Sequence, residues 1–181
     1  MKALLDACVL YPTVMREMLI GVARAGLFQP LWSARILEEW ARATRKIDAA
    51  AEMFARGEIA LLRAAFPKAE INPAPGLERQ LWLPDQDDIH VLAAAISGSA
   101  DVIVTTNRQD FPQNILTSEG VTRRDPDGFL WQLWSEHPDG VGALAKQVQS
   151  QAETLSGAPQ PIRKLMKKAR LPRLGKALEQ A

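Results

Sequence analysis

Residues 85–107, "DQDDIHVLAAAISGSADVIVTTN", decide the fold that this sequence predicts. Three acids open the stretch, an apolar segment at 89–97 has the composition of a buried helix, and Gly98 is placed to end that helix. Residues 101–106 follow as a β-branched run, which is typical of a strand buried on both faces of a parallel sheet. The stretch therefore predicts a helix and then a central strand, with polar side chains at the start of the first and the end of the second.

The chain before this stretch alternates short apolar strands with helices. The predicted strands lie at 2–6, 28–32 and 68–71, and the predicted helices at 14–26, 34–46 and 48–66. Ser33 is placed to cap the second of these helices. Strands that alternate with helices of this length predict an α/β domain with a mostly parallel central sheet and helices on both faces.

Strand signals stop at about residue 125, and three helical segments follow. We therefore expect a domain at 1–134 and a helical C-terminal extension at 135–181. Residues 1–160 hold 15 Lys and Arg against 20 Asp and Glu, whereas residues 161–181 hold 7 basic residues and one acid. The tail alternates these cations with apolar residues at helical spacing, which predicts docking on the body or on another chain, or binding to an RNA backbone.

The composition excludes several classes of protein. Apolar residues make up 47% of the 181 residues and charged residues 24%, as in an ordinary globular protein. Cys8 is the single cysteine, so the sequence holds neither an internal disulfide nor a zinc site built from cysteines. No run is long enough to cross a membrane and no secretory signal is visible, so we expect a cytoplasmic protein.

Four acids fall at positions where an open parallel sheet gathers its functional groups, beyond the carboxyl ends of the strands. Asp6 interrupts an apolar run at the end of the first strand, Asp88 opens a helix, and Asp110 follows the strand that ends near Thr105. Glu39 lies inside the helix at 34–46. Each acid also has a structural interpretation: Asp6 and Asp110 as turn residues, Asp88 as a helix cap, and Glu39 as a surface acid paired with Arg35 or Arg42.

Several carboxylates in one pocket repel each other unless a cation lies among them. Oxygen ligands without cysteine, and with only two histidines in the chain, favour Mg²⁺ or Mn²⁺ over zinc. Such an ion can activate water against a phosphodiester. His90 follows Asp88 by two residues, so its side chain points elsewhere and a structural role is favoured. Cys8 is interpreted as a small buried residue.

The segments "LLDACVL" (4–10), "SARILEEW" (33–40), the stretch 85–107 and "DFP" (110–112) together resemble PIN-domain ribonucleases, in particular the VapC-like toxins of bacterial toxin–antitoxin pairs. The resemblance covers about residues 1–130 and implies a three-layer α/β/α PIN-like nuclease domain at 1–134. It implies that Asp6, Glu39 and Asp88 bind the metal, and that the hydroxyl of Thr105 orients the site. Asn107 stands where the family usually has a fourth Asp, so either Asn107 or Asp110 completes the site, around one metal or two.

The resemblance further implies an endoribonuclease that depends on Mg²⁺ or Mn²⁺, the cognate antitoxin as a partner, and a homodimer. Arg108 and Arg35 are candidates for holding the RNA backbone. The alternative is a catalytically weakened PIN domain that binds RNA or protein, which Asn107 favours. A phosphatase of the haloacid-dehalogenase type needs a second acid at the position of Cys8, so it is disfavoured.

Overall fold

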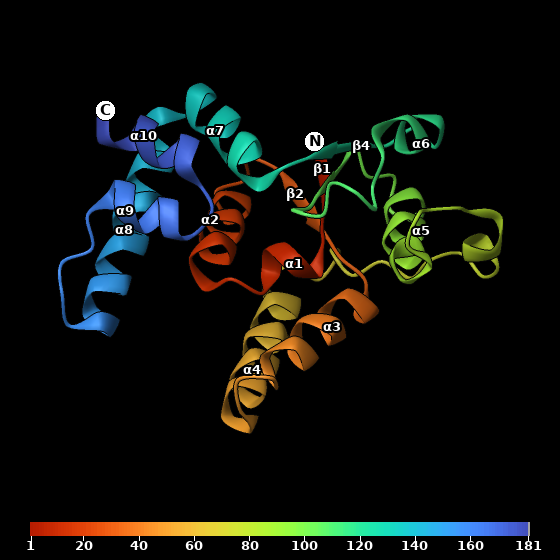
Figure 1. Cartoon of the computed structure of the whole chain (residues 1–181), viewed down its shortest axis with the longest axis horizontal. Coiled ribbons are helices and arrows are strands. Elements are labelled where there is room, and N and C mark those ends of the chain that lie inside the picture. Colours follow the sequence, from red (N-terminus) through yellow and green to blue (C-terminus); the bar gives the residue numbers. More distant parts are fainter. Residues whose placement is uncertain (181) are drawn as a thin grey trace. The chain divides into compact units, whose positions relative to one another are not determined.

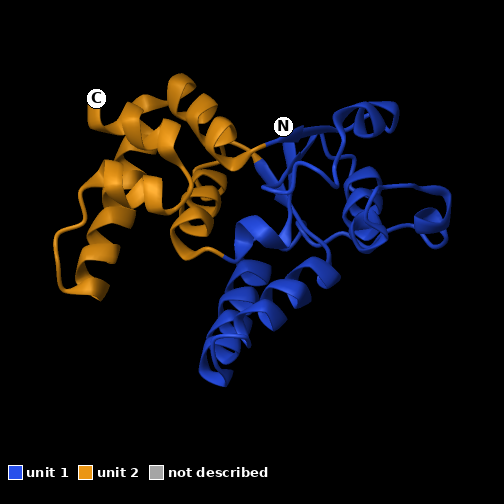
Figure 2. Ribbon diagram, viewed as in Figure 1, with its two compact units in different colours: residues 1–11, 29–124 blue, residues 12–28, 125–181 orange. Residues whose placement is uncertain are grey.

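The computed structural model describes residues 1–180 and divides the chain into two compact units (Figure 2). Unit 1 comprises residues 1–11 and 29–124, and unit 2 comprises residues 12–28 and 125–181. The predicted boundary at residue 134 concerns the extent of a nuclease domain. Contacts between residues do not test that extent, so the boundary stays a prediction.

A four-stranded parallel sheet lies at the centre of unit 1 (Figure 1). Its strands follow the order β2-β1-β3-β4, with bounds β1 (Lys2–Leu5), β2 (Gln29–Leu31), β3 (Val102–Val104) and β4 (Thr122–Arg124). In the central pair, Leu4 lies opposite Ile103. The predicted α/β class is therefore confirmed, whereas β4 was not predicted.

The stretch at 85–107 folds as its pattern predicts. The 3-10 turn η2 (Gln86–Asp88) leads into α5 (Ile89–Ser97), and α5 ends at Gly98 before β3 begins. All three residues of β3 are buried, as expected for a continuous β-branched run. Gly98 is required by close packing, because a β-carbon there would lie 2.9 Å from Cδ1 of Leu31.

Five further helical segments complete unit 1: α1 (Ala7–Leu10), α3 (Ala34–Thr44), α4 (Ala49–Ala65), the 3-10 turn η1 (Leu77–Gln80) and α6 (Gln113–Ser118). The strand expected at 68–71 is wrong, since only an isolated bridge joins Glu70 to Trp32. Pro67 and Pro73 flank this segment, and proline has no N–H to donate to a ladder.

The start of α3 is held by Ser33, as predicted. The Oγ of Ser33 accepts a hydrogen bond from the backbone N–H of Ile36 at 3.2 Å, and the side chain is buried. We expect Ser33→Ala to lower the free energy of unfolding by about 1 kcal/mol, and Ser33→Gly by only a few tenths, because glycine is itself a tolerated cap. Urea denaturation followed by circular dichroism measures both, and an equal loss in the two variants would contradict a capping role.

Unit 2 is helical. It comprises α2 (Thr13–Arg24), α7 (Pro126–Glu136), α8 (Pro138–Ser156), α9 (Ile162–Lys168) and α10 (Pro172–Gln180). Within this unit, α10 packs on α9 and α7, and α2 packs on α8. The sequence predicted the last segment as one helix at 161–171, whereas the structure forms a helical hairpin that continues through α10. Within residues 1–180, no helix combines the length and the apolar character that a membrane span requires.

Candidate functional site

The candidate site lies at the carboxyl ends of β1 and β3, which are neighbours in the middle of the sheet. The chain leaves β1 toward β2 on one side and leaves β3 toward β4 on the other. Open α/β sheets form their binding crevices where the strand order diverges in this way. Asp6 directly follows β1, and Thr105 directly follows β3.

Asp6 is held by hydrogen bonds from both strand ends. Its Oδ2 accepts from the Thr105 hydroxyl at 2.7 Å and from the Cys8 thiol at 3.1 Å, and its side chain is buried. The Thr105 Oγ1 in turn accepts from the backbone N–H of Asn107 at 3.0 Å. Burial first, and then the charge of Asp6, raise the pKa of Cys8 to about 11, so the thiol stays protonated as a donor. Cys8 therefore holds Asp6 in place, a contact that the sequence did not reveal.

Three other carboxylates gather beside this point. Asp85, Asp88 and Asp110 each offer an oxygen, and these oxygens all lie within 4.8 Å of one another. Asp85 precedes η2 and Asp88 is its last residue, while Asp110 comes from the loop after β3. Asp85 also caps η2, because its Oδ1 accepts from the backbone N–H of Asp87 at 2.9 Å. It is therefore both a cap and a member of the cluster.

The carboxylates near Asp88 perturb its ionisation. Burial is the largest cause that raises the pKa of Asp88 to about 6, followed by the negative charges of Asp6, Asp85 and Asp110. The charge of His90 opposes the shift. Asp6 thus acts electrostatically on the cluster, although it is not among the three acids whose oxygens lie mutually within 4.8 Å.

Asn107 joins two members of the cluster. Its Nδ2 donates to Oδ2 of Asp88 at 3.0 Å, and its Oδ1 accepts from the backbone N–H of Asp110 at 3.4 Å. The amide oxygen is therefore engaged with the loop, and the amide nitrogen faces the carboxylate. Asn107 therefore hydrogen-bonds to both Asp88 and Asp110. Of Asn107 and Asp110, it is Asp110 that contributes a carboxylate oxygen to the cluster.

Glu39 lies on α3 in a separate network. Its Oε1 accepts from Nε2 of His90 at 3.0 Å and from Nε of Arg35 at 3.2 Å. Burial raises the pKa of Glu39, but hydrogen bonds and charge from His90 and Arg35 outweigh burial, so its pKa is lowered. His90 is 2% exposed, as expected of a structural histidine, and it connects α5 to this candidate ligand.

The arginines near the site differ in their engagement. Arg35 forms the predicted alternative pair with Glu39, and its Nη2 also donates to the carbonyl oxygen of Asp87 at 3.4 Å. Arg42 pairs with Glu38 instead of Glu39. The side chain of Arg108 is exposed and forms no ion pair within residues 1–180. Among these arginines it is therefore the one whose charge is available to bind an anion.

The donor set fits a hard divalent cation. The clustered atoms are carboxylate oxygens, which Mg²⁺ and Mn²⁺ prefer. Burial and then the neighbouring negative charges raise the pKa of Asp88, and a bound cation would relieve the repulsion between those charges. Protein zinc sites usually include cysteine or histidine ligands, whereas Cys8 stays a protonated thiol bonded to Asp6.

Comparison with known protein families matches residues 2–109 to the PIN domain. No curated protein and no solved structure matches the chain significantly. The matched region runs from β1 to the loop after β3 and so spans Asp6, Glu39, Asp88, Thr105 and Asn107. PIN domains are generally nucleases that use divalent metals, and the acidic cluster is compatible with that chemistry. Since the match covers more than half of the chain, this protein belongs to the PIN-domain family.

Proposed function

We propose that this protein is an endoribonuclease that depends on Mg²⁺ or Mn²⁺. The observation that supports it most strongly is the group of Asp85, Asp88 and Asp110, where burial first, and then the charges of Asp6, Asp85 and Asp110, raise the pKa of Asp88 to about 6. At neutral pH the mutual repulsion of these carboxylates destabilises the folded chain, and a bound cation would relieve it.

In this proposal the residues that hold the ion are Asp88 and Asp110 with Asp6, and Asp85 adds charge. Glu39 completes the family's acidic set from α3. The bound ion would supply an activated water and would stabilise negative charge on the phosphodiester. Hydrolysis by that water breaks a P–O bond without the RNA 2′-hydroxyl acting as the nucleophile.

The surrounding residues keep the acids in position. Thr105 and Cys8 donate to Asp6, the Asn107 amide donates to Asp88, and His90 donates to Glu39. Side chains that hold metal-binding groups in this way typically affect metal affinity or activity 10–100-fold. Arg108 is exposed beside Asn107 in the same loop and is the candidate contact to the RNA backbone, with Arg35 as a second.

We further propose that the protein is the VapC-like toxin of a toxin–antitoxin pair, with an antitoxin as partner and a homodimer as its state. The motif order from "LLDACVL" to "DFP" supports this subtype. Induced expression in a bacterial host is expected to arrest growth for wild type and not for Asp6→Asn. Equal arrest by both would contradict a toxin that acts through this site.

The experiment on the proposed chemistry uses an end-labelled RNA and identifies the ends of the fragments. We expect internal cleavage that requires Mg²⁺ or Mn²⁺ and leaves no 2′,3′-cyclic phosphate, because water is the nucleophile. Fragments that end in a cyclic phosphate would contradict the proposal, as would cleavage that persists in EDTA. RNA binding without any cleavage would support the alternative of a catalytically weakened binding module.

The geometry around Asn107 predicts which residue completes the site. Asp110→Ala should weaken Mn²⁺ binding by at least about 100-fold, and Asn107→Ala by about tenfold, because loss of an outer hydrogen bond costs less than loss of a ligand. Calorimetric titration with Mn²⁺ measures both affinities on matched alanine variants. The reverse order would make Asn107 the ligand.

A further inference from the structure

A basic surface lies on α9 and α10 in unit 2. Five of its side chains are exposed cations: Lys164, Lys167, Lys168, Arg170 and Lys176. The three lysines of α9 share one helical face, because they stand at spacings of three and four residues. We call these five residues the basic surface.

The apolar side of this hairpin is already occupied. Leu165 and Met166 of α9 and Leu174 of α10 are buried, and α10 packs on α9 and α7 within the unit. Gly175 permits the close crossing of the two helices, since a β-carbon there would lie 2.8 Å from Cβ of Met166. The tail thus needs no other chain to cover its apolar stripe, and the cations remain on the open side.

The cations of the basic surface are not neutralised by acids. Within residues 1–180, none of the five forms an ion pair, whereas their neighbour Arg163 bonds to Glu179 at 2.7 Å. Helices α3 and α4 of unit 1 differ, because Arg35, Arg42, Arg45 and Arg56 are paired with acids of the same two helices. Clustered, unpaired cations repel each other, and a polyanion would relieve that repulsion.

Arg170 supports the same interpretation through its backbone. It has φ of 61°, at the turn after α9 where helices usually place glycine. Its N–H donates to the carbonyl oxygen of Lys167 at 3.1 Å, so the turn itself needs only the backbone. An arginine in this left-handed conformation is strained relative to glycine, and it places an exposed cation at the end of α9.

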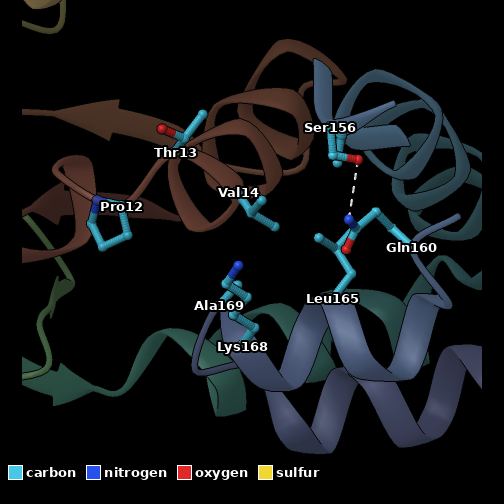
Figure 3. A pocket seen from close by; sticks show the side chains of 9 residues that line it. Pro12, Thr13, Val14, Ser156, Gln160, Leu165, Lys168 and Ala169 are labelled. Carbon is cyan, nitrogen blue, oxygen red and sulfur yellow. Dashed lines mark hydrogen bonds between the residues drawn. The ribbon is translucent and has the colours of Figure 1, made fainter. Parts of the chain in front are cut away.

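A hollow of about 420 Å³ adjoins the basic surface at Lys168 (Figure 3). Figure 3 shows the Lys168 side chain pointing into it from α9, opposite the start of α2. Its wall also carries the hydroxyls of Thr13 and Ser156 and the amide of Gln160. Nε2 of Gln160 donates to Oγ of Ser156 at 3.1 Å, so Lys168 is the charged group that this hollow offers to an anion.

From these observations we infer that the basic surface of α9 and α10 binds the phosphate backbone of single-stranded RNA, independently of base sequence. The basic surface would be a second place where the RNA substrate contacts the protein, so the inference rests on the proposed function. The competing ligand for the basic surface is an acidic protein segment, and the experiment distinguishes it from RNA.

The experiment measures binding of a fluorescent single-stranded RNA to the full chain in EDTA, where no metal-dependent cleavage occurs. The triple variant Lys164→Gln/Lys167→Gln/Lys168→Gln is compared with Lys46→Gln/Lys68→Gln/Arg79→Gln, which removes the same charge from scattered exposed positions of unit 1. In the triple lysine variant, here called the tail variant, three lost phosphate contacts should make the negative slope of log K against log salt shallower by about 2. Wild type should therefore lose about 16-fold more affinity than the tail variant between 50 and 200 mM salt. The control variant should retain the wild-type slope.

Arg170→Gly separates binding from folding. It should raise the melting temperature by about 2–4 °C, because strain is relieved, and yet weaken RNA binding. Unchanged RNA affinity and slope in the tail variant would overturn the inference, as would poly-glutamate displacing the RNA at equal charge concentration. Because RNA binding is measured without metal, its result is independent of the cleavage assay. The tail variant can bind RNA more weakly than wild type even if the protein does not cleave RNA. Conversely, the protein can cleave RNA even if the tail variant binds it as wild type does.

Discussion

Asp88→Asn is expected to abolish RNA cleavage while making the metal-free protein more stable at pH 7. Activity should fall at least about 100-fold, the lower end of what a single catalytic group contributes. Stability should rise because the neutral amide removes the repulsion from Asp6, Asp85 and Asp110, which contributes to the raised pKa of Asp88. Opposite changes of this kind are characteristic of functional sites that carry strain.

The measurements are the initial rate of RNA cleavage with Mn²⁺ and the melting temperature in EDTA. Asp87→Asn is the matched control, since this exposed acid stands one residue away and is not in the cluster. It should leave both quantities near the wild-type values. If Asp88→Asn lowers stability as well as activity, the loss of cleavage reflects damage to the fold, and the account of the cluster fails.

Metal binding is expected to stabilise the protein strongly, and more so as the pH rises. The pKa of Asp88 is raised from 3.8 to about 6 in the folded state, so the folded protein retains a proton that the unfolded chain releases. The resulting stability is fully present below about pH 4 and is lost as the pH rises through 6. Glu39 has a lowered pKa and acts in the opposite sense, but only below its ordinary value of 4.5.

The metal-free protein should therefore lose stability between about pH 4 and 6, and Mg²⁺ or Mn²⁺ should restore it above pH 6. At about 100 times its dissociation constant a bound ion adds about 2.7 kcal/mol, which is about 5–10 °C for a chain of this size. Thermal melts at pH 5 and pH 7.5, with and without metal, measure the effect. Asp88→Asn should remove most of the pH dependence and of the metal shift. An equal metal shift at the two pH values would contradict binding at this cluster.

The sequence predicted the elements that depend on local pattern. The β-branched run 101–106 and the apolar segment 89–97 became β3 and α5, and Asp6 lies at the end of β1 as expected. By contrast, Asp85 and Asp88 both stand beside a short 3-10 turn, and helix-capping rules cannot tell a cap from a ligand there. The two-residue spacing of Asp88 and His90 excluded a contact between their side chains. It could not identify Glu39 as the partner of His90, because the contact between His90 and Glu39 joins α5 to α3.

The same limit applies to Cys8 and to the tail. Position 8 has apolar neighbours in sequence, and only the pairing of β1 with β3 brings its thiol to Thr105 and Asp6. For the tail, the apolar spacing predicted burial, and the structure provides it within unit 2. The turn at Arg170 was not predicted, because arginine is a poor signal for a left-handed residue.

The central claim is that the carboxylates at the ends of β1 and β3 hold a divalent ion that RNA cleavage requires. Its most direct test is cleavage of a labelled RNA by purified protein after EDTA treatment and after return of Mn²⁺, for wild type and Asp6→Asn. The account predicts that wild type recovers cleavage with Mn²⁺ and that Asp6→Asn does not. Equal cleavage by the two proteins, or cleavage by wild type in EDTA, would contradict it.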